Sequence, residues 1–140
     1  MRIFKAIISI LLVVIFIALL ISAYSTYKSN LSTAGLIDAA STIANHLVVR
    51  ELAVEAFGST VDYAIDPAKI SSLEFWQTIG GENFSFNILL RYNMIDEKAL
   101  GPYGPEAPPT EPVASLVLPV SVYENYSFKP GKLEVKVWRK

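Results

Sequence analysis

The chain has 140 residues, of which 52% are hydrophobic and 18% are charged, and its formal net charge is −1. A near-neutral charge without a basic cluster argues against a nucleic-acid partner. The chain contains no cysteine, which excludes a disulfide framework, a thiolate metal site and a cysteine nucleophile.

An apolar segment near the N-terminus is the most informative stretch. Residues 6–21 contain one polar side chain, that of Ser9, and no glycine, proline or charge. Extended to residue 23, the segment would form about 27 Å of helix, close to the roughly 30 Å hydrocarbon core of a bilayer. A helix that is apolar on all sides has no face for water. We therefore expect it to lie in lipid or in the core of an assembly of like helices.

The flanks of this segment predict its orientation. Arg2 and Lys5 precede it, whereas Tyr24 and Tyr27 follow it. The positive-inside rule places residues 1–5 in the cytoplasm and the rest of the chain after the segment outside, with both tyrosines at the outer interface. A cleaved secretory signal is the alternative, although its apolar region would be at the long end of the usual range.

Residues 24–57 are predicted to continue the same helix. Leu36, Ala40, Ile43, Leu47 and Val54 recur at helical spacing, which indicates one apolar stripe. Gly58 then follows as a natural C-terminal stop. The sequence thus predicts one helix from residue 3 to 57, with a membrane-like first half and an amphipathic second half that packs on a domain.

Residues 58–140 are predicted to form an extracellular β domain. Residues 61–65 are typical of a short strand, and residues 84–93 alternate between apolar and polar side chains, the pattern of a half-buried strand. Residues 114–122 and 133–137 alternate in the same way. The apolar strand residues predicted to pack on the helix and complete the core are Phe84, Phe86, Ile88, Leu90, Tyr92, Leu133, Val135 and Val137. We expect these last two strands to pair as a hairpin.

Three segments between the predicted strands have other signals. Residues 72–77 are expected to form a brief helical turn, residues 96–112 a long Pro- and Gly-rich exposed loop, and residues 128–131 the turn of the last hairpin. The helix and the sheet each present an apolar face that needs a partner. The predicted fold class is therefore α+β, a long hydrophobic-to-amphipathic helix followed by a small antiparallel β-sheet domain.

Candidate catalytic or metal-binding residues are few. His46 is the only histidine and lies among apolar residues. Glu51 and Glu55 would share one helix face and could hold a metal, but solvated helix charges are the commoner explanation for such a pair. A phosphate-binding loop and a Ser-His-Asp set are both missing. We therefore predict no catalytic residue, no metal site and no cofactor.

Three Asn-x-Ser motifs follow the apolar segment, at Asn30, Asn83 and Asn125. They are a modest excess over chance, and all lie on the side predicted to be outside. We predict N-glycosylation at these three asparagines.

The start of the chain carries a resemblance to a known family. Lys5, Ala6 and Ile7 form a basic residue, a small residue and the start of the hydrophobic run. This pattern resembles the class III signal that prepilin peptidases cut, here between Ala6 and Ile7. With the helix and the β domain, the chain resembles type IV pilins, and the glycosylation motifs and missing cysteines are similar to those of archaeal pilins. The glutamate of bacterial pilins at the fifth mature position is replaced by Leu11, a departure that many archaeal pilins share.

The resemblance implies a processing and assembly sequence. A prepilin peptidase would remove the cytoplasmic leader, residues 1–6, and residues 7–23 would form a helix that spans the membrane before assembly. That helix would then pack in the core of an extracellular filament formed by self-association.

Two alternatives remain open at this stage. One is a minor pilin or pseudopilin of a Tad-like machine. The other is a single-pass membrane-anchored extracellular β domain that binds a surface layer or a partner protein.

Overall fold

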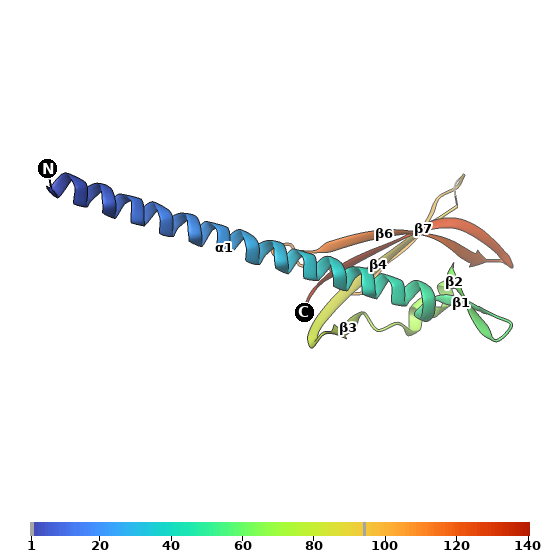
Figure 1. Ribbon diagram of the computed structural model, residues 1–140. Helices are drawn as coiled ribbons and strands as arrows, with labels where there is room; N and C mark the ends of the chain where they lie inside the picture. Colours follow the sequence, from blue (N-terminus) through green and yellow to red (C-terminus); the bar gives the residue numbers. More distant parts are fainter. Residues whose placement is uncertain (1, 94) are drawn as a thin grey trace. The chain divides into compact units, whose positions relative to one another are not determined.

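The computed structural model describes residues 2–93 and 95–140. It confirms the α+β class, with a 50-residue N-terminal helix, Arg2–Glu51, followed by a seven-stranded sheet (Figure 1). The chain divides into two units at the Ala34–Gly35 boundary. In the first unit residues 2–34 are helical, and the second unit holds the rest of the helix together with the sheet.

The helix ends earlier than the sequence predicts. α1 (Arg2–His46) passes into a π-helical turn, η1 (Leu47–Glu51), which closes with a 2.8 Å hydrogen bond from the Leu52 amide to the Leu47 carbonyl. The prediction of helix to residue 57 is therefore wrong, because residues 53–56 pair as a strand with the residues that follow them.

A β-hairpin takes the place of the last predicted helical turns. β1 (Ala53–Ala56) pairs antiparallel with β2 (Ser59–Ile65), which contains the predicted strand 61–65. Phe57 and Gly58 form the turn, with φ of 53° and 80°, as tight hairpin turns require. Gly58 thus lies in a hairpin turn rather than at the end of a helix.

The next segment also differs from the prediction. Residues 67–72 form the 3₁₀ helix η2 (Pro67–Ser72), which starts where the Asp66 carboxylate accepts a 3.1 Å hydrogen bond from the Ala68 amide. Proline at the first helical position suits such a start. The predicted helical turn at 72–77 is wrong, because β3 (Trp76–Ile79) pairs there with the following strand.

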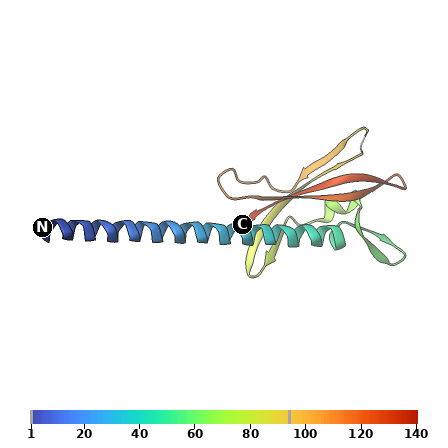
Figure 2. The same cartoon turned by 45° about the horizontal axis from the view of Figure 1, so that its top comes forward.

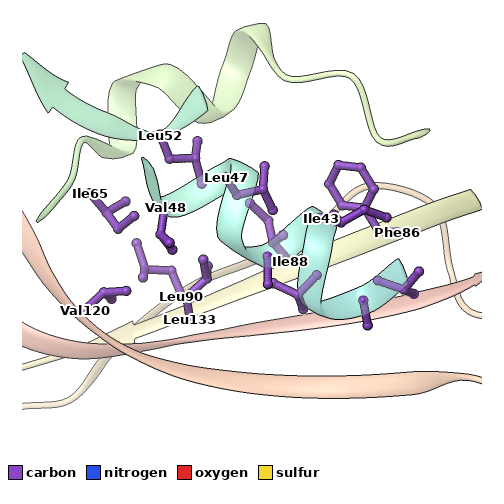
Figure 3. Packing of buried hydrophobic residues seen from close by; sticks show 14 of the residues in the cluster. Ile43, Leu47, Val48, Leu52, Ile65, Phe86, Ile88, Leu90, Val120 and Leu133 are labelled. Carbon is purple, nitrogen blue, oxygen red and sulfur yellow. The ribbon is translucent and has the colours of Figure 1, made fainter. Parts of the chain in front are cut away.

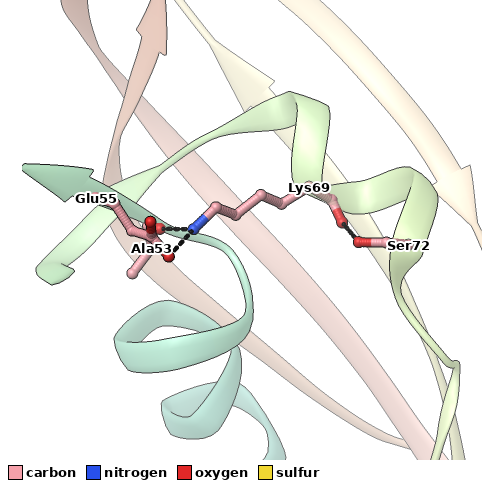
Figure 4. A network of polar contacts seen from close by, with 4 residues as sticks. All are labelled: Ala53, Glu55, Lys69 and Ser72. Atoms are coloured by element: carbon pink, nitrogen blue, oxygen red, sulfur yellow. Dashed lines mark hydrogen bonds and ion pairs between the residues drawn. The ribbon is translucent and has the colours of Figure 1, made fainter.

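Lys69 joins η2 to the β1 strand. Its ammonium group donates a 2.7 Å hydrogen bond to the Ala53 carbonyl and lies 3.5 Å from the Glu55 carboxylate, while Ser72 bonds back to the Lys69 carbonyl (Figure 4). These contacts hold the short helix against the end of the hairpin.

The centre of the sheet is made by the strands with the clearest alternation. β4 (Glu82–Tyr92) and β6 (Ala114–Glu124) flank β7 (Ser127–Arg139), both antiparallel to it. The predicted β6–β7 hairpin is confirmed, but its turn lies at Asn125 and Tyr126, and residues 128–131 belong to β7.

β5 (Lys98–Tyr103) lies in the segment predicted to be an exposed loop. It pairs antiparallel with the outer edge of β4, so residues 96–97 and 104–112 are the parts of this region that lack strand structure. Proline and glycine favour a loop locally, but pairing with β4 supplies the backbone hydrogen bonds of this edge strand.

The sheet is mixed rather than purely antiparallel as predicted. Its order is β1-β2-β6-β7-β4-β3, with β5 beside β4, and β2 pairs with β6 in parallel over two positions, Ala64 with Ser121 and Ile65 with Val122. Alternation shows that a segment is a strand but not which way its neighbour runs.

The core lies between the second half of the helix and the sheet (Figures 1 and 2). The helix buries the predicted residues Leu36, Ala40, Ile43 and Leu47, while Val54, predicted to join them, is only half-buried in β1. Figure 3 shows this packing in detail. The sheet residues predicted to complete the core are all buried: Phe84, Phe86, Ile88, Leu90, Tyr92, Leu133, Val135 and Val137.

Candidate functional site

In the first unit the helix exposes an apolar surface on all of its sides. Every residue from 2 to 35 is exposed, including the branched side chains of Leu11, Val14 and Ile15, which are 56%, 57% and 47% exposed. The helix is long and apolar enough to cross a membrane.

This surface needs an apolar environment for energetic reasons. Fully burying one Val, Leu or Ile side chain stabilises a protein by about 1.5–3 kcal/mol. None of the side chains of residues 2–34 is buried within the chain. A helix with the same composition on all sides can satisfy this need in lipid or among like helices. The composition and length of this helix are therefore compatible with membrane anchoring.

The predicted cleavage residues lie at the start of this helix. Lys5, Ala6 and Ile7 are all helical and exposed in the first turns of α1. The peptide bond predicted to be cut therefore lies close to a helix end, where the first N–H groups have no intrahelical partner.

The three predicted glycosylation sites are accessible. Asn30 lies on α1, Asn83 on β4 and Asn125 at the β6–β7 turn, and all three are exposed. The Asn83 side-chain oxygen accepts a 2.6 Å hydrogen bond from Thr78. Asn125 has a φ of 50°, a left-handed conformation that asparagine tolerates well.

The candidate metal residues are separated by the early helix end. His46 lies 3.0 Å from the Glu51 carboxylate, whereas Glu55 belongs to β1 and pairs with Lys69 at 3.5 Å. Glu51 and Glu55 therefore do not share a helix face. Within residues 2–93 and 95–140, no group of three or more His, Asp or Glu side chains could hold a metal ion.

A polar cluster that sequence reasoning missed joins β4, β5, β6 and β7. Glu124 at the end of β6 lies 3.3 Å from Lys98 and 3.9 Å from Lys129. Hydrogen bonding to Glu124, followed by burial, raises the pKa of Tyr92 to about 12. Hydrogen bonding from Tyr92, and then the two lysines, lowers the pKa of Glu124 against the effect of burial. These residues are far apart in sequence, so no local pattern indicates the cluster.

The fold defines a class of protein in which an exposed apolar N-terminal helix is joined to a β-sheet domain. Comparisons with family models, with curated proteins and with solved structures gave no match for this chain. The class therefore rests on the geometry of the helix and the sheet.

Proposed function

We propose that this chain is a structural subunit of an archaeal type IV pilus-like surface filament. The observation that carries the proposal is the contrast along a single helix. From residue 2 to 35 all residues are exposed, whereas Leu36, Ile43 and Leu47 are buried in the core of the β domain. Such a helix suits a subunit that keeps its own domain folded and offers a free apolar segment to lipid first and to other copies later.

The predicted processing and surface decoration agree with this role. Prepilin peptidase would remove residues 1–6 and leave Ile7 as the new N-terminus of the helix. The exposed motifs at Asn30, Asn83 and Asn125 are accessible for glycosylation, and glycans would add a solvated outer surface to an extracellular filament.

An assembly assay with a matched pair of variants tests the proposal. Ile15→Asp places a charge on the apolar helix, where a central acidic residue costs about 2.5–3.5 kcal/mol in a membrane. Val117→Asp makes the same kind of change on β6, where the valine is 55% exposed. We expect filaments sheared from cells to contain the wild-type and Val117→Asp chains but not the Ile15→Asp chain.

The same assay separates the alternatives. A wild-type chain found only in the membrane fraction would overturn the filament proposal in favour of an anchored β domain. A wild-type chain present in filaments at trace levels, beside a different major subunit, would indicate a minor pilin instead.

A further inference from the structure

The hairpin of β3 and β4 places a predicted glycosylation site beside an exposed tryptophan. Thr78 lies directly opposite Asn83, and Trp76 lies opposite Ser85. Residues that face each other across two strands share one side of the sheet, as do alternate residues of one strand. All four side chains therefore project from the same face. Phe84, which lies between Asn83 and Ser85, belongs to the core with the helix, so this face points away from the core.

Lys140 reaches the same face from the end of β7. In Figure 1 the C-terminus lies beside the turn that joins β3 to β4. The Lys140 amide donates a 3.0 Å hydrogen bond to the Asn83 carbonyl, and the Lys140 ammonium lies 5.4 Å from the centre of the Trp76 ring. With the ammonium in place, Trp76 is still 49% exposed, so much of the indole surface stays open. We name Trp76 and Lys140 the tryptophan platform.

The side chain of Asn83 is held by its neighbour across the hairpin. Its oxygen accepts a 2.6 Å hydrogen bond from the Thr78 hydroxyl, which leaves the amide nitrogen, the atom that would carry a glycan, free of Thr78. Asn83 and Trp76 are diagonal neighbours across the two strands. Such positions lie about 7–8 Å apart, within reach of aromatic and long side chains. A sugar on Asn83 therefore starts within reach of the tryptophan platform.

We propose that the first sugars of a glycan on Asn83 pack on the tryptophan platform. This inference rests on the glycosylated exterior of the proposed function and names the protein surface that the glycan covers. A pyranose ring presents C–H groups with partial positive charge, and the face of an aromatic ring is negative. The Lys140 ammonium adds N–H donors for the sugar hydroxyls. The platform thus offers a sugar ring both an apolar surface and hydrogen-bond donors.

The burial of Ser85 sets the order of events. Ser85 supplies the hydroxyl of the glycosylation motif but is only 8% exposed, and Trp138, which lies opposite it on β7, is buried as well. A glycosyltransferase that reads this hydroxyl can reach it only before β3, β4 and β7 pair. The glycan is therefore attached before the β domain folds, and it settles on the platform as the hairpin closes.

Hydroxyl-radical footprinting of the native chain tests the contact. Trypsin cuts after Lys69 and Arg91, and no lysine or arginine lies between them, so one peptide, 70–91, carries both Trp76 and Asn83. Mass spectrometry of this peptide then shows for the same molecules whether Asn83 holds a glycan and whether Trp76 is oxidised.

The comparison is with bare wild-type chains from a host that lacks N-glycosylation. We expect several-fold less oxidation of Trp76 in chains with a glycan on Asn83 than in bare chains. Phe75 is half-buried against Phe86 and lies on the same peptide, so it should react equally in both and serves as the internal control.

Thermal unfolding of the full chain in detergent gives a second measure. The glycosylated wild-type chain should unfold at a higher temperature than the bare chain, whereas the two forms of Trp76→Ala should differ less. Phe57→Ala is the matched control, because Phe57 is a fully exposed aromatic residue at the β1–β2 turn. It should keep the full difference between the glycosylated and bare forms.

The outcomes separate this contact from the filament proposal. Glycosylated chains in which Trp76 reacts as it does in bare chains would overturn the contact and leave the filament proposal intact. Native chains in which Asn83 carries no glycan would overturn it in the same way. Failure of the wild-type chain to form filaments would overturn the filament proposal but not the contact, which lies within one chain.

Discussion

Phe86 and Asn87 are neighbours on β4 with opposite environments. Phe86 is 2% exposed and its ring centroid lies 5.7 Å from that of Phe75. Asn87 is half-buried on the other face of the strand and donates a 3.1 Å hydrogen bond to the Pro105 carbonyl. The two positions therefore differ in what truncation removes, a core contact in one case and one hydrogen bond in the other.

We predict that Phe86→Ala lowers the free energy of unfolding by about 3–5 kcal/mol, because it leaves a cavity in the core. Asn87→Ala should cost about 0.5–1.5 kcal/mol, the usual net contribution of one hydrogen bond. Denaturant titration of the full chain in detergent micelles measures both values. Equal losses for the two variants would contradict the helix-on-sheet core.

The stability of the β domain depends on pH through Tyr92 at alkaline pH and through Glu124 at acidic pH. The pKa of Tyr92 is raised from 10.0 to about 12, so its contribution to stability is present below pH 10 and is lost as the pH rises through about 12. The pKa of Glu124 is lowered from 4.5, so its contribution is present above pH 4.5 and is lost as the pH falls below that value.

We predict that Glu124→Gln lowers the pKa of Tyr92 back towards 10.0, because it removes the carboxylate charge and replaces a charged acceptor of the tyrosine hydroxyl with a weaker, neutral amide oxygen. Tyrosinate absorbance during an alkaline titration measures this shift. Tyr92→Phe identifies the affected tyrosine, since its titration step near pH 12 should disappear from the wild-type curve. An alkaline titration unchanged by Glu124→Gln would contradict the pairing.

At the scale of elements, α1 is one helix with two different surroundings. Its N-terminal part is exposed on all sides and its C-terminal part packs on the sheet. Residues 2–6, which the predicted peptidase would remove with Met1, are all exposed, so their removal takes none of their side chains from the core.

We predict that the native protein begins at Ile7 and that Lys5→Ala leaves Met1 in place, because the predicted cut needs the basic residue before Ala6. Lys28→Ala, a change of the same kind on the same helix, should not affect processing. Mass spectrometry of the intact protein measures all three termini. A wild-type terminus near Tyr24 or Thr26 would indicate a secretory signal instead, and an intact wild-type Met1 would favour a simple membrane anchor.

At the scale of the whole molecule, the predicted topology places everything after residue 23 outside the cell. The three glycosylation motifs fall in both units, at Asn30 in the first and at Asn83 and Asn125 in the second. Modification of all three would require that the helix continuation and the β domain share one side of the membrane.

We therefore predict glycan on Asn30, Asn83 and Asn125 in native material, and none on Asn87, which has no hydroxyl residue two positions later. Glycopeptide mapping measures the occupancy of each site. If all three asparagines were bare, the support that these motifs give to a glycosylated exterior would be lost.

Features that depend on local composition and period could be predicted from the amino-acid sequence. An uninterrupted apolar run predicts an exposed apolar helix without reference to any partner, and the helix is present over residues 2–35. Strict alternation likewise predicted β4, β6 and β7, because a strand with one buried face must repeat every two residues. The buried stripe that includes Ile43 and Leu47 followed from helical spacing in the same way.

Other features depend on which segment pairs or packs with which, and these appear only in the folded chain. Residues 53–56 leave the helix because β2 is there to pair with them, and residues 98–103 become a strand because β4 has a free edge. The parallel β2–β6 pairing and the Tyr92–Glu124 cluster arise in the same way. They differ from the local predictions because hydrogen bonds and packing from a partner strand outweigh local propensities of less than about 1 kcal/mol per residue.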